Sequence, residues 1–578
     1  MVSQESMERI RKRFVRLYGE RAPELIERLH MMIGRYGVGI DVAPLNERWT
    51  EKDTLLITYA DMVQHEGERP VVTLKRFLEK RLHGAFRTVH ILPFSPWSSD
   101  DGFSVIDYRA VNPNYGEWGD VESLSQSFQL MFDLVLNHCS SQSGWFRDFI
   151  NGTEPGSGYF IKGDPEADLS EVVRPRPWPL LTKVTTHEGD RHVWTTFSED
   201  QVDLNWENPN VLFEFIDILL FYISKGMRII RLDAVAYLWK KLGTSCIHLE
   251  ETHEIVKLLR DIVDMVAPQT IIISETNVPH AENISYLGQR DEAHMVYQFS
   301  LPPLLLYSLL RGNCQELRAW ALSLPPLAED TTFLNFTASH DGIGMRPLQG
   351  LISDADLSWL VQEITARHGL VSTRRMADGS ESPYELNITY ASALSDPNDV
   401  LLGRQRFLCS QAVAMSMQGI PAIYFHSLMG APNDLHGVQE KGHSRAINRK
   451  KWDELELRTL LNESDGEASI IFESMVGLLR RRADYPAFHP DAGQEILDLG
   501  DAVFALIRVA KDTSQRIVCL FNMSREDQMI PKDVVLSQLH WEADTHTKLR
   551  DLTTGLFVDH ESKSLALAPY QYLWLVTE

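Results

Sequence analysis

Short, unbroken apolar runs recur between residues 55 and 424, and longer polar or amphipathic stretches separate them. Runs of this length without polar alternation are typical of strands buried on both faces. Between them, helices are predicted over 208–225 and 250–265. The eight predicted strands are 55–59, 90–94, 130–137, 228–233, 271–275, 295–299, 333–336 and 420–424. Strands that alternate with helices in this way predict an α/β fold, a (β/α)8 TIM barrel.

Two gaps between predicted strands are too long to be simple loops, and both ends of the chain break the alternation. The first gap is rich in Gly, Pro, Ser and charged residues, which predicts a small inserted subdomain, and the second predicts a lid over the barrel mouth. The predicted division is an N-terminal helical extension over 1–50, a catalytic barrel over 51–500 with inserted subdomains at 139–205 and 343–405, and a C-terminal antiparallel β domain over 501–578.

The charge of the chain restricts the partners that it could bind. The 578 residues carry a formal net charge of −24, which argues against nucleic acid and against an anionic membrane surface. The five cysteines are scattered and form no CxxC pair, so neither a disulfide framework nor a zinc cluster is indicated. The first residues lack the apolar core of a signal peptide, and no apolar run is long enough to span a membrane. These features predict a cytoplasmic enzyme without metal or cofactor, and a homodimer is compatible with them.

Three acidic residues stand at the C-terminal ends of predicted strands. Asp233 and Glu275 end two of the apolar runs, and Asp341 follows a third. A buried strand has no structural use for an ionised carboxylate at its tip, because desolvating the charge is costly. Any one of these acids could equally be a surface or helix-capping residue. Together, at the strand ends where a TIM barrel carries its active site, they predict glycoside chemistry.

Retaining glycosidases need one carboxylate as nucleophile and a second, protonated, as acid and then base. Asp233 lies two residues after Arg231, whose guanidinium is expected to lower the pKa of that carboxyl, as suits a nucleophile. Glu275 follows an apolar run, where partial desolvation is expected to raise its pKa toward the acid role. Asp341 could bond sugar hydroxyls and stabilise an oxocarbenium-like transition state.

Four motifs in order carry a family resemblance. They are Asp-Leu-Val-Leu-Asn-His at 133–138, Arg-Leu-Asp-Ala at 231–234, Glu275 after its strand, and His340-Asp341. On these motifs the chain resembles, over roughly residues 50–578, the α-amylase superfamily (glycoside hydrolase family 13) of retaining α-glucosidases and transglucosidases. The resemblance implies that Asp233 is the nucleophile, Glu275 the acid/base and Asp341 the transition-state stabiliser.

Finer features, among them Ser-Asp-Asp-Gly-Phe at 99–103 and Ala-Ile-Asn-Arg at 446–449, resemble the sucrose-phosphorylase-like branch. That resemblance implies a dead-end glucose subsite, transfer of one α-glucosyl unit, and inorganic phosphate as the partner of the sugar substrate. On the acceptor side it implies Arg176 as the phosphate ligand, with Gln201 and the lid residue Tyr384, although Arg176 could also be an ordinary surface-loop arginine. The other implied substrate-binding residues are Asp100, Phe103, His138, Arg231, Tyr237, His340 and Arg445.

The acceptor is indicated less directly. The lid segment departs from sucrose phosphorylases at Ser382 and Glu385, where those enzymes carry Asp and Gln. Residues 93–101 and 445–451 resemble the glucosylglycerate phosphorylases. The expected activity is therefore that of a hexosyltransferase, the reversible phosphorolysis of 2-O-α-D-glucosyl-D-glycerate to α-D-glucose 1-phosphate and D-glycerate. A sucrose or sucrose 6'-phosphate phosphorylase and a hydrolase of small α-glucosides are the alternatives, whereas a non-catalytic member of the fold would be expected to lack one of the three acids.

Overall fold

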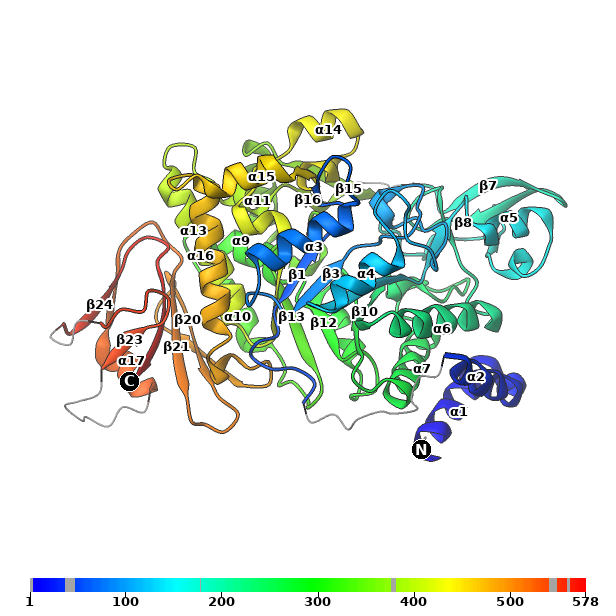
Figure 1. The fold of residues 1–578 in the computed structure, drawn as a ribbon, viewed down its shortest axis with the longest axis horizontal. Helices are drawn as coiled ribbons and strands as arrows, with labels where there is room; N and C mark the ends of the chain where they lie inside the picture. The colour runs from blue at the N-terminus through cyan, green and yellow to red at the C-terminus, as the bar shows by residue number, and fades with distance from the viewer. Residues whose placement is uncertain are drawn as a thin grey trace.

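A closed barrel of eight parallel strands forms the centre of the molecule (Figure 1), and its strands follow one another around the barrel in chain order. The computed structural model describes residues 4–36, 47–176, 178–375, 381–539, 548–558 and 562–577. Every predicted apolar run coincides with one barrel strand, so the predicted TIM barrel is confirmed. The barrel strands are β1 (Leu55–Thr58), β3 (Thr88–Ile91), β4 (Gln129–Val135), β10 (Met227–Asp233), β11 (Ile271–Ser274), β12 (Met295–Tyr297), β13 (Thr332–Phe336) and β17 (Ile420–Tyr424).

Helices surround the barrel and cover the outer face of its strands, which are almost wholly buried. The two helices predicted from periodicity are confirmed as α6 (Pro209–Ser224) and α7 (Glu250–Val266). Helix α6 begins where the side chain of Asn208 accepts a hydrogen bond from the backbone N–H of Asn210, with Pro209 in the first turn. The other long covering helices include α3 (Pro70–Arg81), α9 (Leu301–Arg311), α13 (Val400–Ser416) and α16 (Glu467–Arg482).

Two insertions add small antiparallel sheets beyond the ends of barrel strands. After β4, strand β5 (His138–Ser140) pairs with β9 (Gln201–Asp203), and β7 (Leu181–Thr186) and β8 (Gly189–Trp194) belong to a second sheet. After β13, three strands form a sheet in which β16 is central: β14 (Ile343–Gly344), β15 (Leu370–Arg375) and β16 (Glu381–Asn387). Both insertions follow the C-terminal end of a strand, where a barrel carries its binding site.

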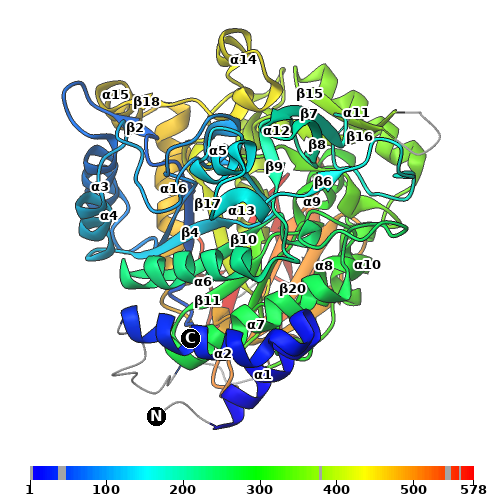
Figure 2. The ribbon, with the colours of Figure 1, turned by 90° about the vertical axis from the view of Figure 1, so that its right-hand side faces the viewer.

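The N-terminal helices α1 (Gln4–Tyr18) and α2 (Ala22–Tyr36) pack against α7 and α6, respectively (Figure 2). Leu25 and Leu29 of α2 are buried, and the two helices confirm the helical character predicted for the start of the chain. From α1, Arg13 contacts the buried carboxylates of Glu254 (3.3 Å) and Asp261 (3.4 Å) on α7. The extension is therefore joined to the barrel by both apolar packing and buried ion pairs.

The C-terminal part is an antiparallel sheet with strand order β19-β20-β21-β25-β23, at the opposite side of the barrel from the inserted β7 and β8 (Figure 1). Its strands are β19 (Gly493–Asp498), β20 (Val503–Val509), β21 (Arg516–Asn522), β23 (Leu549–Asp551) and β25 (Tyr572–Thr577). The sheet starts at β19, slightly before the predicted boundary at residue 501. No helix in the described ranges has the length and apolar character needed to cross a membrane. The cytoplasmic location and the homodimer stay predictions.

Candidate active site

One pocket at the C-terminal ends of the barrel strands is lined by every side chain that the sequence predicted for catalysis or binding. The lining includes Asp233, Glu275 and Asp341, which come from three different strand ends. Residues that the sequence did not suggest also line it, namely Phe197, Ala234, Ala236, Thr276, Asn277 and Val278. A barrel brings its strand ends together at one face, so segments far apart in the chain share this pocket.

A chain of buried charges fixes Arg231 beneath the predicted nucleophile. Nη1 of Arg231 donates to Oδ1 of Asp233 at 2.6 Å and also to Asp133. The other oxygen of Asp133 lies 2.7 Å from Nε2 of His90. All of these groups come from the adjacent strands β3, β4 and β10, whose register places Arg231 beside Asp133. The rigid barrel therefore sets the orientation of the Asp233 carboxylate before any substrate binds.

The backbone immediately after Asp233 turns sharply. Ala234 adopts a left-handed conformation with φ 49°, which is uncommon for a residue with a Cβ atom. This turn directs the N–H of Ala234 to Oε2 of Glu275, at 3.0 Å. The same oxygen lies 3.8 Å from Nη2 of Arg231. Local strain of this kind is found where a site must hold its groups in one geometry, and here it brings Glu275 next to Asp233.

Burial raises the pKa of both Asp233 and Glu275 above the usual carboxyl range. The charges of Glu275 and Asp133 raise the pKa of Asp233 further, and that of Asp341 raises the pKa of Glu275. Arg231 lowers the pKa of both, but burial has the larger effect. The expectation of a lowered pKa for Asp233 is therefore wrong, because the sequence does not show how deeply this carboxyl is buried. Two close buried carboxyls retain one proton between them. Because Asp233 has the shorter contact with Arg231, the negative charge belongs on Asp233 and the proton on Glu275.

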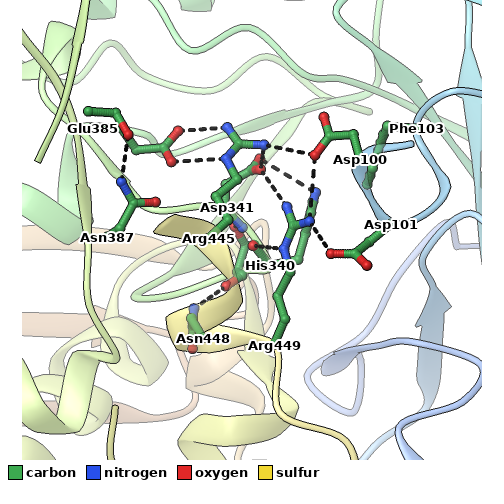
Figure 3. Close-up of polar contacts among 12 residues, drawn as sticks. Asp100, Asp101, Phe103, His340, Asp341, Glu385, Asn387, Arg445, Asn448 and Arg449 are labelled. Carbon is green, nitrogen blue, oxygen red and sulfur yellow. Dashed lines mark hydrogen bonds and ion pairs between the residues drawn. The ribbon is translucent and has the colours of Figure 1, made fainter. Parts of the chain in front are cut away.

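Asp341 lies in a second cluster of buried charges, shown in Figure 3. Nη1 of Arg445 contacts Oδ1 of Asp341 at 2.5 Å. The other side of the same guanidinium is held by Glu385, with Nε donating to Oε1 at 3.0 Å and Nη2 to Oε2 at 2.6 Å. Although burial alone would raise the pKa of Asp341, Arg445 and Arg449 hold it below its usual range. Asp341 is therefore ionised and could stabilise positive charge on a sugar ring.

The loop that carries Asp100 and Phe103 closes the pocket beside this cluster. Phe103 stacks on His340, with ring centroids 4.7 Å apart and an interplanar angle of 4°. Arg449 donates to Oδ2 of Asp101 at 2.7 Å and lies 3.5 Å from Oδ1 of Asp100. The loop requires glycine at 102, where φ is +116° and a Cβ atom would lie 2.6 Å from the carbonyl oxygen of Pro93.

His138 and Gln201 come from the paired strands β5 and β9 and meet at the carbonyl oxygen of Phe103. Nε2 of His138 lies 3.0 Å from this oxygen and Nε2 of Gln201 donates to it at 3.3 Å. Tyr237 follows in the turn after Ala234 and also lines the pocket, as does Arg176 from the first insertion. The first insertion thus reaches the pocket, as predicted for Arg176 and Gln201.

Strand β16 reaches the pocket through a β-bulge. Thr373 of β15 pairs with Pro383 and Ser372 pairs with Glu385, so Tyr384 is the extra residue between them. A bulge alters the alternation of side chains along a strand. Here the consecutive residues Tyr384 and Glu385 both serve the site, since Tyr384 lines the pocket and Glu385 holds Arg445.

Glu385 is the main functional residue that the sequence did not place in the site. Its side chain is 1% exposed, and its partner Arg445 lies far along the chain. The sequence marked Glu385 only as a departure of the lid segment from sucrose phosphorylases, which indicated a different acceptor and not a contact with Arg445. For metal ions, the described ranges hold no group of three or more His, Cys, Asp or Glu side chains arranged as ligands.

Comparison with known proteins places this geometry in a family. The family model that describes the α-amylase catalytic domain matches residues 85–320 of this chain. A glucosylglycerate phosphorylase from Spirochaeta thermophila is 46% identical over 90% of this chain and 89% of its own length. The chain belongs to the α-amylase family. Within this family it belongs to the branch of the glycoside phosphorylases, as the sequence indicated.

Two further relatives support this membership of the α-amylase family. A glucosylglycerate phosphorylase from Allomeiothermus silvanus is 45% identical over 89% of this chain and 92% of its own length. The crystal structure of sucrose 6F-phosphate phosphorylase from Thermoanaerobacter thermosaccharolyticum superposes with a TM-score of 0.71 at 26% identity, covering 82% of this chain and 94% of that one. This chain is therefore similar to phosphorylases of the branch in both sequence and fold.

Proposed function

We propose that the protein is a retaining glucosylglycerate phosphorylase, a hexosyltransferase that converts 2-O-α-D-glucosyl-D-glycerate and phosphate into α-D-glucose 1-phosphate and D-glycerate. The observation that carries the proposal is the pairing of Asp233 and Glu275, bridged by Arg231, in a pocket that Arg176 also lines. Similarity over nine-tenths of the chain to proteins named glucosylglycerate phosphorylase supports the choice of substrate.

In the first step, the Asp233 carboxylate attacks the anomeric carbon while Glu275 gives its proton to the departing glycerate oxygen. The product is a β-glucosyl ester of Asp233. The charge distribution supports these roles, because Arg231 favours the ionised form of Asp233 and burial keeps a proton on Glu275. Asp341 lies ionised on another side of the pocket, where it would stabilise the oxocarbenium-like transition state.

In the second step, a phosphate oxygen attacks the anomeric carbon of the ester, Asp233 leaves, and Glu275 takes up the phosphate proton. Two inversions retain the α configuration of the glucosyl group. Arg176 suits the phosphate because a guanidinium binds phosphate with two parallel hydrogen bonds. Arg176 also helps to hold down the pKa of Asp341, which supports its position near the reacting centre.

The test is phosphate release from α-D-glucose 1-phosphate with D-glycerate, glycerol, fructose, fructose 6-phosphate or no acceptor. We expect release with D-glycerate to exceed every other condition by at least about tenfold, since a site built for a charged acceptor rejects neutral ones by this amount or more. Preferential release with fructose or fructose 6-phosphate would identify a sucrose-type phosphorylase instead. Equal release without acceptor would identify a hydrolase.

A further inference from the structure

Two arginines of the second insertion flank the strand that brings Tyr384 to the pocket. Arg374 lies on β15 opposite Ser382 of β16. Arg346 begins a short 3-10 helix just after β14, and the N–H of the preceding Met345 donates to the carbonyl oxygen of Tyr384 at 2.9 Å. Both arginines therefore lie near Tyr384 in the sheet. Arg374 is opposite the residue two positions before Tyr384, and Arg346 directly follows the residue that is hydrogen-bonded to the Tyr384 carbonyl.

Neither guanidinium group has a close carboxylate partner among the residues that the structure describes. Nε of Arg346 and Nε of Arg374 are both buried and have no hydrogen-bond partner among the described residues. Arg346 is only 9% exposed and hydrogen-bonds the side chain of Tyr237. Its one ion pair within the described ranges is a 3.9 Å contact with Glu282. Glu282 is itself 45% exposed and lies closer, at 3.1 Å, to His248. This arrangement contrasts with Arg231 and Arg445, each of which contacts two carboxylates closely.

The two arginines also act on each other and on the tyrosines of the pocket. Burial lowers the pKa of Arg374, and the positive charge of Arg346 lowers it further. Arg346 in turn opposes the rise that burial causes in the pKa of Tyr237 and of Tyr384. The two arginines are not part of the pocket lining themselves, but they act on Tyr237 and Tyr384, which are. Two neighbouring cations, one buried and one partly buried, are unfavourable unless an anion joins them.

We propose that Arg346 and Arg374 form an oxyanion subsite for the acceptor, which binds the carboxylate of a small hydroxy acid or the phosphate that takes its place. Planar guanidinium groups suit both anions, because each can accept two parallel hydrogen bonds. The subsite rests on the proposed function for its place in the reaction, and it adds two residues to the acceptor side that the sequence did not indicate.

The subsite can be tested with Arg346→Gln, Arg374→Gln and the double variant, and with Arg404→Gln as a matched control. Arg404 lies on α13 and pairs with Glu467 at 2.9 Å, in a part of the chain that does not pack on Tyr237 or Tyr384. Loss of a charge-assisted hydrogen bond costs about 1.5–3 kcal/mol, which is about a 10- to 150-fold effect on binding. We therefore expect the KM for D-glycerate, with α-D-glucose 1-phosphate as donor, to rise about tenfold or more in each single variant. The control should match the parent.

A second arm measures phosphate separately, with α-D-glucosyl fluoride as donor and phosphate as acceptor. A rise in the KM for phosphate as well as for D-glycerate identifies one shared anion subsite, and a rise for only one of them identifies which anion it serves. KM values for both anions within about twofold of the parent in the folded double variant would overturn the subsite, because loss of even one such bond predicts about tenfold.

The two arms also separate this subsite from the proposed function. If the parent enzyme transfers no glucose to D-glycerate, the substrate assignment fails, while the phosphate arm still tests the arginines. Arg374→Lys, which keeps the charge, should restore part of the lost affinity, an effect that a purely structural role would not produce. If Arg346→Gln unfolds, as its melting temperature would reveal, Arg374→Gln alone decides, because Arg374 is only partly buried.

Discussion

The glucose side and the acceptor side of the pocket are built on different principles. On the glucose side, Arg231 and Arg445 each lie between two carboxylates, and Asp233 and Glu275 stand at the ends of barrel strands. On the acceptor side, Arg346 and Arg374 come from an insertion, and the buried Nε atom of each has no hydrogen-bond partner among the described residues. The comparison teaches that the barrel supplies a prearranged reaction centre, whereas the insertions supply a site completed by its ligand.

The largest expected effect is on the glucose side. Asp233→Asn removes the nucleophile's charge and little volume, so kcat should fall by about 10⁴-fold or more while the fold is kept. Steady-state kinetics with α-D-glucose 1-phosphate and D-glycerate, alongside a circular dichroism spectrum, would measure both. Retention of more than about one-hundredth of the activity would contradict the nucleophile role, because loss of such a residue costs far more.

Glu275→Gln should separate the two chemical steps and alter the pH profile. Since burial raises the pKa of Glu275, the parent should keep its acid form, and hence its activity, above the usual carboxyl range and lose it as pH rises through that raised pKa. The pH profile of the variant should lack this alkaline limb. Its kcat with a poor leaving group should be lower by about 10²–10⁴-fold. Formation of the glucosyl-enzyme from α-D-glucosyl fluoride, which needs little protonation, should be nearly normal. An unchanged alkaline limb would assign that pKa to another group.

Glu385→Gln tests the boundary between the two sides, because Glu385 belongs to an insertion but holds Arg445 beside Asp341. Loss of the ionic fork should reduce kcat/KM about 10-fold or more and the free energy of unfolding by about 1–3 kcal/mol. Glu381→Gln, on the exposed part of the same strand, is the control and should change neither. Equal behaviour of the two variants would mean that Arg445 is positioned without Glu385.

Asp101→Asn should give the smallest effect, on stability. Burial raises the pKa of Asp101, but Arg449 outweighs this and lowers it to about 2. A carboxyl with a lowered folded-state pKa stabilises the fold above its unfolded pKa, and this contribution is lost as pH falls toward the folded value. The variant should therefore be less stable by about 1–2 kcal/mol at neutral pH, with the difference disappearing between about pH 4 and pH 2. Urea unfolding at several pH values would measure this, and a difference independent of pH would exclude the ionic contribution.

The sequence predicted the glucose side better than the acceptor side, for a physical reason. Uninterrupted apolar runs such as 271–274 locate barrel strands, and an acid at the end of such a run has few structural uses, so Asp233 and Glu275 could be recognised. The fork between Glu385 and Arg445 joins an inserted sheet to a loop after the last barrel strand, and no local pattern encodes that contact. Arg346 likewise resembles a surface residue until the fold buries it.

The start of the C-terminal sheet was also predicted only approximately from the sequence. Its alternating strands were predicted from residue 501, but β19 (Gly493–Asp498) already pairs with β20. Every residue of β19 is at least partly exposed, so its apolar pattern is weak. Strands at the edge of a sheet are defined by their hydrogen bonds to a neighbour more than by burial, and a single sequence does not reveal that neighbour.

The helical extension at the start of the chain has a practical consequence for recombinant production. Arg9 and Arg13 of α1 neutralise Asp261 and Glu254, two acids of α7 that are 3% exposed, and α7 is the helix that follows the strand of Asp233. A shortened enzyme that begins near residue 47 would expose apolar surface on α6 and α7 and leave these acids without their cations. Truncations should therefore spare residues 4–36, even though none of these residues lines the pocket.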